Sequence, residues 1–152
     1  MNSSVMQSSA RPGVATARTV LGLFKLRIGT LIMITALAGM ASAGGPALSL
    51  PQVLVLALSV LVASGAAGAF NQFVEAESDR LMARTRGRAF ATGVLQPTAR
   101  WLWVIAALLA TAVGAAATVL NAASAAFIFL GAFFYGCLLY TSPSPRDRQK
   151  SR

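Results

Sequence analysis

Long apolar runs alternate with short polar segments along most of this chain. The runs that could form helices cover residues 21–43, 51–73, 102–120 and 122–136. A helix needs about 20 mostly apolar residues to cross a membrane, because each residue adds about 1.5 Å. The first three runs reach about this length, and the fourth is marginal. The pattern predicts an all-α protein, a polytopic transmembrane helix bundle with about four helices in this chain.

The composition supports the membrane class. Of the 152 residues, 56% are hydrophobic and only 11% are charged, whereas soluble domains carry roughly 25% charged residues. The net charge of +9 does not indicate nucleic-acid binding, because the basic residues lie between apolar runs. There they set topology and attract anionic lipid or diphosphate. With no histidine and a single cysteine, the sequence predicts neither a zinc site nor an internal disulfide.

The segments between the apolar runs are alternately basic and uncharged. Lys25 and Arg27 stand at the start of the first run. The basic residues between the second and third runs are Arg80, Arg84, Arg86, Arg88 and Arg100. Loops 41–52 and 121–124 carry no charge, so the positive-inside rule predicts that the N-terminus and the basic loop lie on the cytoplasmic side of the membrane. Residues 1–19 are Ser-rich without an apolar core, and we expect a disordered cytoplasmic tail there.

A polar stripe follows the second apolar run. Asn71, Glu75 and Asp79 lie four residues apart, and such positions share one face of a helix. Carboxylates near the end of a membrane helix need a partner, and Mg²⁺ typically binds one or two carboxylates plus phosphate oxygens. The stripe therefore predicts a magnesium site that holds a substrate phosphate. Glu77 faces another side of the helix and is not counted as a ligand.

A structural interpretation of the same residues stays open. The stripe and the arginines after it could form an exposed helix end stabilised by salt bridges, each of which contributes little to stability. Arg86 and Arg100 are better explained as charges that set topology. For Trp101 and Trp103, the default is an aromatic belt at the membrane interface.

Residues 137–152 differ in character from the rest of the chain. The apolar sequence changes abruptly to serine, proline and arginine, and residues 137–147 resemble a translated sequencing adapter. We expect residues 137–152 to be an artefact tail outside the fold. Without their four basic residues and one acidic residue, the net charge falls to +6. Cys137 belongs to this tail, so we assign it no redox or metal role.

Two segments carry a resemblance to a known family. The motif at residues 71–88, NQFVEAESDRLMARTRGR, resembles the first aspartate-rich motif of the UbiA superfamily of intramembrane prenyltransferases. Its Leu-Met-x-Arg-Thr-x-x-Arg run is most similar to the protoheme IX farnesyltransferase (haem O synthase) branch. The segment at residues 23–40, LFKLRIGTLIMITALAGM, is similar to the opening helix of that branch. The resemblance covers residues 20–136.

The resemblance implies a fold, an activity and a location in a bacterial inner membrane. Members of the family have nine transmembrane helices and a second aspartate-rich motif, so residues 20–136 would be the first part of the domain, a truncated and inactive fragment. The implied reaction moves a farnesyl group from farnesyl diphosphate to a vinyl group of haem b (protohaem IX), giving haem O, with Mg²⁺ as cofactor. Two alternatives stay open. One is another aromatic acceptor, such as 4-hydroxybenzoate or a quinone precursor, and the other is a non-catalytic small membrane protein.

The resemblance also implies roles for individual residues. The candidate catalytic and metal-binding residues are Asn71, Glu75 and Asp79. The candidate diphosphate-binding residues are Arg84, Arg88 and Lys25. This chain has Arg88-Ala89 where the family usually has Arg-Pro, and Lys25-Leu26-Arg27 where it usually has Lys-Pro-Arg. Neither change removes a charged group.

Overall fold

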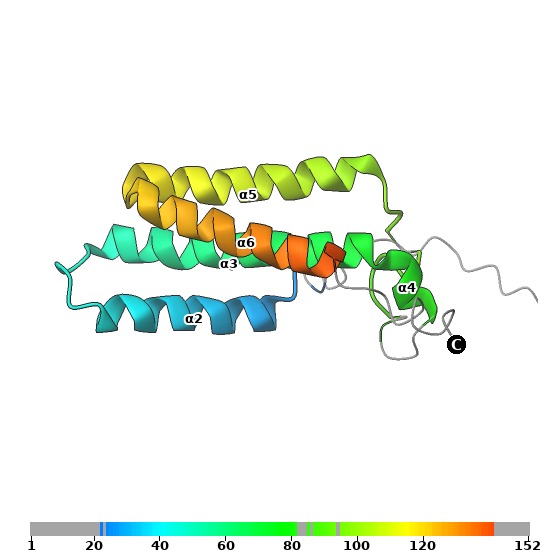
Figure 1. Ribbon diagram of the computed structural model, residues 1–152, viewed down its shortest axis with the longest axis horizontal. Helices are drawn as coiled ribbons and strands as arrows, with labels where there is room; N and C mark the ends of the chain where they lie inside the picture. Colours follow the sequence, from blue (N-terminus) through cyan, green and yellow to red (C-terminus); the bar gives the residue numbers. More distant parts are fainter. Residues whose placement is uncertain (1–21, 23, 82–84, 86, 94, 142–152) are drawn as a thin grey trace, which may run out of the picture.

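Helices make up most of the described part of the chain. The computed structural model describes residues 22, 24–81, 85, 87–93 and 95–141. The helices within these ranges are α2 (Leu26–Ser42), α3 (Leu50–Val74), α4 (Ala76–Leu81), α5 (Ala99–Val119) and α6 (Ala122–Thr141). The four long helices run side by side, and α4 lies at one end of the bundle (Figure 1). The predicted all-α helix bundle is confirmed.

The central helix of the bundle is α3, which contacts α2, α5 and α6, while α5 and α6 also contact each other. Its buried residues are mostly small: Ser59, Ala63, Gly65, Ala66, Gly68, Ala69, Asn71 and Gln72. Small residues let helix backbones approach closely, which is how helices associate in lipid. At Gly29 of α2, a Cβ would lie only 3.1 Å from the Leu61 side chain of α3. A larger residue at this position would therefore require the Leu61 side chain to shift.

The four-residue spacing predicts one continuous helix through the polar stripe, but the structure shows a break within it. The helix α3 ends at Val74, Glu75 follows it, and α4 begins at Ala76. Two backbone hydrogen bonds nevertheless cross this break: the Glu75 N–H donates to the Asn71 carbonyl at 3.0 Å, and the Asp79 N–H donates to the Glu75 carbonyl at 2.8 Å. The four-residue spacing of the stripe is therefore kept although the helix is interrupted.

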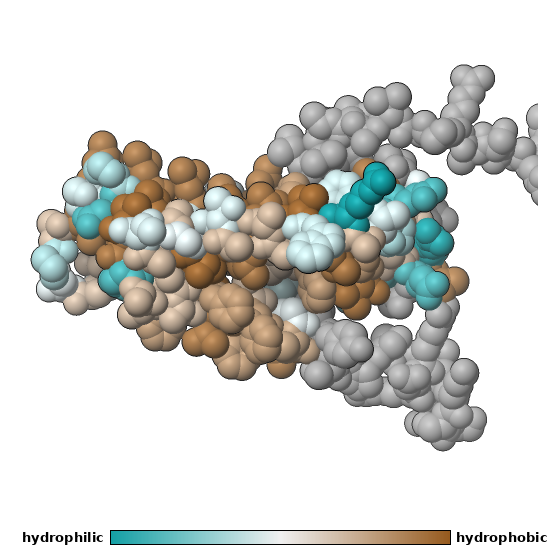
Figure 2. Space-filling view, turned by 90° about the horizontal axis from the view of Figure 1, so that it is seen from above, coloured by the Kyte–Doolittle hydropathy of each residue, from teal (hydrophilic) through white to brown (hydrophobic). Residues whose placement is uncertain are grey.

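The bundle presents an apolar flank. Large hydrophobic side chains are exposed on α2, α3, α5 and α6, and in Figure 2 hydrophobic residues cover the middle of the molecule while hydrophilic residues gather toward its ends. Both α3 and α5 are long and apolar enough to cross a membrane, whereas α2 is a shorter apolar helix of 17 residues. The first predicted span was thus too long. Helix α2 begins only at Leu26, because the preceding Lys25 has a left-handed backbone conformation, which interrupts an α-helix.

Most of the two predicted terminal segments lies outside the described residues. The helix α6 continues past Gly136 to Thr141, so it crosses residue 137, where we expected adapter-derived sequence to begin. Residues 142–152 lie outside the described residues, as does the predicted N-terminal tail at 1–19.

Candidate functional site

Five charged or polar side chains meet at the end of the bundle where α3 gives way to α4. We call Lys25, Asn71, Glu75, Asp79 and Arg88 the polar cluster. Arg88 lies at its centre: its Nη1 donates to the two carboxylate oxygens of Asp79 at 2.7 and 2.9 Å and to Oε2 of Glu75 at 3.2 Å. One guanidinium nitrogen thus joins the two acidic residues of the stripe.

Asn71 links this ion pair to Lys25. Its amide is oriented with the nitrogen donating to Glu75 Oε2 at 3.3 Å and the oxygen accepting from Lys25 Nζ at 3.2 Å. The opposite orientation would place like groups together, so the hydrogen-bond partners decide it. A continuous chain of polar contacts therefore runs from Lys25 through Asn71 and Glu75 to Arg88.

Burial differs among the three acidic groups near the break. The Asp79 side chain is only 5% exposed and that of Glu75 is 36% exposed, whereas Glu77 is exposed on α4. This arrangement matches the expectation that Glu77 faces away from the stripe. Asp79 is thus a nearly buried carboxylate whose charge is met by Arg88, and such a charge requires a partner.

Lys25 is placed by a strained backbone. Its φ of 44° and ψ of 48° are left-handed, a conformation that costs a non-glycine residue about 1–2 kcal/mol. Such strain concentrates at functional sites, where the surrounding structure maintains it. Burial, and then the nearby Arg88 charge, lower the pKa of Lys25 from its ordinary value, while Glu75 and Asp79 act in the opposite direction.

Contacts on both sides of Lys25 maintain this position. The preceding Phe24 packs over Gly65 of α3, where a Cβ would lie 3.2 Å from the Phe24 ring, and Lys25 packs over Gly68. The side chain of Gln72, which is 2% exposed, donates to the Gly22 carbonyl at 3.4 Å. The segment before α2 is therefore attached to α3 directly beside Asn71.

A single buried aromatic residue anchors the loop that carries Arg88. Phe90 is fully buried, and its ring makes edge-to-face contacts with Phe73 of α3 at 5.8 Å and with Trp101 of α5 at 5.7 Å. Edge-to-face geometry is a favourable arrangement for aromatic pairs. Because Phe90 is two residues from Arg88, its packing helps to hold the backbone that carries the guanidinium.

Sequence reasoning missed two of these contacts. Phe90 could have been noticed as a lone aromatic residue within a basic loop, but its two ring partners come from distant segments. Gln72 lies beside the stripe rather than on it, and no pattern in the sequence indicates its bond to Gly22. Trp101 was interpreted as an interfacial residue, yet its ring packs on Phe90. Trp103, by contrast, is 77% exposed.

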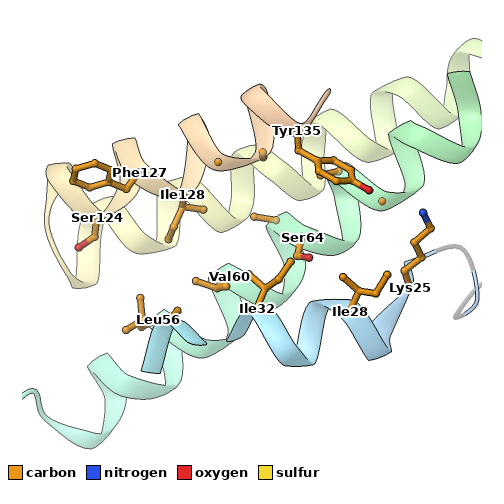
Figure 3. A pocket seen from close by; sticks show the side chains of 16 residues that line it. Lys25, Ile28, Ile32, Leu56, Val60, Ser64, Ser124, Phe127, Ile128 and Tyr135 are labelled. Atoms are coloured by element: carbon orange, nitrogen blue, oxygen red, sulfur yellow. The ribbon is translucent and has the colours of Figure 1, made fainter. Parts of the chain in front are cut away.

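An apolar groove leads away from the polar cluster. It has a cavity volume of about 460 Å³ and lies between α2, α3 and α6. The side chain of Lys25 stands at one end, with Tyr135 across from it, while Leu56 and Phe127 lie toward the other end (Figure 3). We call this cavity the α2–α3–α6 groove. It offers an apolar channel that begins beside a charged site.

The cluster offers a donor set suited to a hard cation. No group of three or more His, Cys, Asp or Glu side chains that could hold a metal occurs within the described residues. Two carboxylates and an amide do meet there, and Mg²⁺ commonly takes only one or two carboxylates, completing its coordination with water and substrate phosphate. Arg84, the remaining candidate diphosphate residue, lies outside the described residues.

Comparison with known proteins identifies the family. Residues 32–147 match the profile of the UbiA prenyltransferase family. The chain belongs to this family. It is 41% identical over 127 residues to protoheme IX farnesyltransferase 2 of Paramagnetospirillum magneticum, an alignment that covers 84% of this chain and 44% of the relative.

Two further relatives carry the name protoheme IX farnesyltransferase. The one from Granulibacter bethesdensis is 34% identical over 142 residues, covering 91% of this chain and 43% of the relative. The one from Synechococcus sp. CC9605 is 39% identical over 126 residues, covering 82% and 38%. The chain therefore spans less than half the length of these relatives. No solved structure shows significant similarity to it.

Proposed function

We propose that this chain is part of a membrane prenyltransferase that transfers a farnesyl group from farnesyl diphosphate to a vinyl group of haem b. The observation that carries the proposal is that two carboxylates and two basic side chains meet at one end of the bundle, where an apolar groove begins. These are the parts that an amphiphilic diphosphate with a long hydrocarbon chain requires. Family membership and the names of the relatives support the same substrates.

The cluster would bind the diphosphate through a divalent cation. Glu75 and Asp79 would provide carboxylate oxygens, and Asn71 would either provide its amide oxygen or orient Glu75. Its present contacts, with the oxygen toward Lys25 and the nitrogen toward Glu75, favour the orienting role. A bound Mg²⁺ would neutralise charge that develops on the leaving diphosphate. Arg88 and Lys25 would hold diphosphate oxygens by charge-assisted hydrogen bonds, together with Arg84.

The α2–α3–α6 groove would hold the farnesyl chain. From Gly68 beside Lys25 to Leu56, α3 extends about 18 Å, at about 1.5 Å per residue. An isoprene unit contributes four chain bonds of about 1.5 Å, or about 5 Å in zigzag form, so three units extend about 15 Å. The length of the groove thus suits a farnesyl chain whose diphosphate lies at the polar cluster.

We infer the following reaction for a farnesyl diphosphate held in this way. As the bond between C1 of the farnesyl group and the diphosphate oxygen breaks, its electron pair leaves with the diphosphate. The cations of the cluster stabilise that negative charge where it develops. The π electrons of the haem vinyl group form the new C–C bond to C1. Water then adds to the resulting cation and releases a proton, which gives a hydroxyethylfarnesyl substituent.

The proposed orientation in the membrane follows from the same end of the bundle. The polar cluster lies at the break between α3 and α4. This break is at the opposite end of the bundle from the turns between α2 and α3 and between α5 and α6 (Figure 1). The basic residues described near this end include Lys25, Arg80 of α4 and Arg88. Basic residues favour the cytoplasmic side. The site would therefore open to the cytoplasm, where a soluble diphosphate could enter.

Magnesium-dependent binding of farnesyl diphosphate tests the proposal. We expect the chain in detergent micelles to bind labelled farnesyl diphosphate with Mg²⁺ and to lose that binding with EDTA. Asp79→Asn should weaken binding about 10- to 100-fold, as expected for a lost charged interaction of about 1.5–3 kcal/mol. The matched control is Glu77→Gln, an equal charge change at an exposed position of the same helix. Equal binding by both variants, or binding indifferent to Mg²⁺, would favour the purely structural interpretation of the stripe.

A further inference from the structure

The position of Arg88 carries an inference about how this side chain changes partner when ligands bind. We propose that Arg88 occupies the metal-binding carboxylates in the ligand-free state and is transferred to the diphosphate when metal and diphosphate bind together. The inference rests on the proposed function, since it concerns the same site. It gives Arg88 two successive partners rather than a single role as a clamp.

The contacts of Arg88 support the first half of this exchange. Its Nη1 lies 2.7 Å from one Asp79 oxygen and 2.9 Å from the other, and 3.2 Å from Glu75 Oε2. These are the oxygens that would coordinate a cation. A divalent cation bound to these oxygens would lie within a few ångströms of the guanidinium, and the two positive charges would repel each other. Metal binding therefore favours movement of Arg88 away from the carboxylates.

The charge of the cluster explains why a metal alone would bind poorly. Among its described side chains, Lys25 and Arg88 balance Glu75 and Asp79, so the cluster is already neutral. A divalent cation alone would leave an excess of two positive charges beside a nearly buried carboxylate. A diphosphate ester carries a charge of about −2 to −3 near neutral pH, by analogy with phosphate esters. Metal and diphosphate together therefore change the net charge by only about one unit or less.

The surroundings of Arg88 allow the movement. Its side chain is 25% exposed, so its remaining donors can be reached by a ligand from water. Its backbone is fixed by hydrogen bonds that do not involve the guanidinium: the Arg88 N–H donates to the Thr85 carbonyl at 3.0 Å, and the Thr92 N–H donates to the Arg88 carbonyl at 2.9 Å. With Phe90 packed beside it, the loop can stay in place while the side chain changes partner.

The test measures metal binding with and without inorganic pyrophosphate. Mn²⁺ replaces Mg²⁺, because loss of the free Mn²⁺ signal in electron paramagnetic resonance reports binding directly. In Arg88→Gln, the carboxylates lose their competitor, and we expect Mn²⁺ alone to bind about 10-fold more tightly than in the unaltered chain. Labelled pyrophosphate in the presence of excess Mn²⁺ should bind about 10-fold more weakly. This opposite pair of changes is the signature of the exchange.

Two further variants separate exchange from simpler explanations. Arg88→Lys keeps the positive charge, so we expect metal binding close to that of the unaltered chain and partial recovery of pyrophosphate binding. Arg80→Gln removes the same charge from an exposed position on α4 and should change neither affinity more than twofold. If it tightens Mn²⁺ binding as much as Arg88→Gln does, general electrostatics explain the effect and the exchange is wrong.

A positioning role alone would give a different result. If Arg88 only holds Glu75 and Asp79 in place, Arg88→Gln should weaken binding of Mn²⁺ and pyrophosphate together, and this outcome overturns the proposal. Unchanged Mn²⁺ affinity overturns it as well. The probes contain no prenyl group. If the opposite changes occur while farnesyl diphosphate fails to bind, the proposed substrate is wrong but the exchange at Arg88 stands.

Discussion

Phe90 should couple the stability of the loop to the chemistry of the site. Its side chain is fully buried against Phe73 and Trp101, and truncation of a buried phenylalanine to alanine typically costs about 3–5 kcal/mol. The loss falls on the loop that carries Arg88. A ligand that binds the variant would have to re-order this loop. If re-ordering costs half of the lost stability, about 2 kcal/mol, the affinity falls about 30-fold. We therefore expect Phe90→Ala to weaken binding of Mn²⁺–pyrophosphate by about 10- to 100-fold.

Three variants, measured in detergent by two assays, test this coupling. The assays are unfolding by titration with SDS and binding of labelled pyrophosphate with Mn²⁺. Phe90→Leu keeps most of the volume and should cost less than about 1.5 kcal/mol, with an intermediate loss of affinity. Phe134→Ala removes a phenylalanine that is 57% exposed on α6 and should leave the affinity within twofold. A Phe90→Ala variant that is clearly destabilised yet binds pyrophosphate with unchanged affinity would refute the reasoning.

Three other changes probe the packing, the groove and the cluster. Gly65→Ala should destabilise the chain toward SDS by about 1–3 kcal/mol, because the new Cβ would overpack against the preceding segment; Gly39→Ala, with open space around it, should not. Val60→Trp should fill the α2–α3–α6 groove and weaken farnesyl diphosphate binding at least 10-fold while pyrophosphate binding is kept, in contrast to Leu54→Trp at an exposed position of α3. Lys25→Met should weaken the binding of labelled pyrophosphate about 3- to 10-fold, which corresponds to about 0.7–1.4 kcal/mol. If the variant binds with the affinity of the unaltered chain, Lys25 is not part of the site.

Most of the fold could be predicted from the sequence because hydrophobic length decides it. The apolar runs at 51–73 and 102–120 correspond closely to α3 and α5, since an uninterrupted apolar run leaves little choice but helix in a membrane. The start of α2 was predicted less well. Hydrophobicity gave no sign that Lys25 would adopt a left-handed conformation, because that conformation depends on contacts with α3.

The sequence predicted that the acidic stripe would lie on one side of the chain, but it did not predict the contacts of these residues. Four-residue spacing brought Asn71, Glu75 and Asp79 onto one side, and the hydrogen bonds across Glu75 keep that spacing despite the break. Which cation meets the carboxylates could not be read from spacing. Arg88 reaches them from a loop whose Phe90 packs against Phe73 and Trp101, long-range contacts that no local pattern encodes.

Two small residues of α3 affect both the packing of the bundle and the candidate site. A substitution at either one would change the space available to the segment that carries Lys25. Gly65 and Gly68 leave the space that Phe24 and Lys25 occupy. A Cβ at Gly68 would lie 3.7 Å from Lys25, an ordinary contact, whereas one at Gly65 would lie 3.2 Å from Phe24. Alanine is therefore tolerable at Gly68, but a larger side chain there would displace Lys25 from Asn71. The close approach of the Lys25 segment to α3 is what places an ammonium group beside Asn71, near the end of α3 that leads into Glu75 and Asp79.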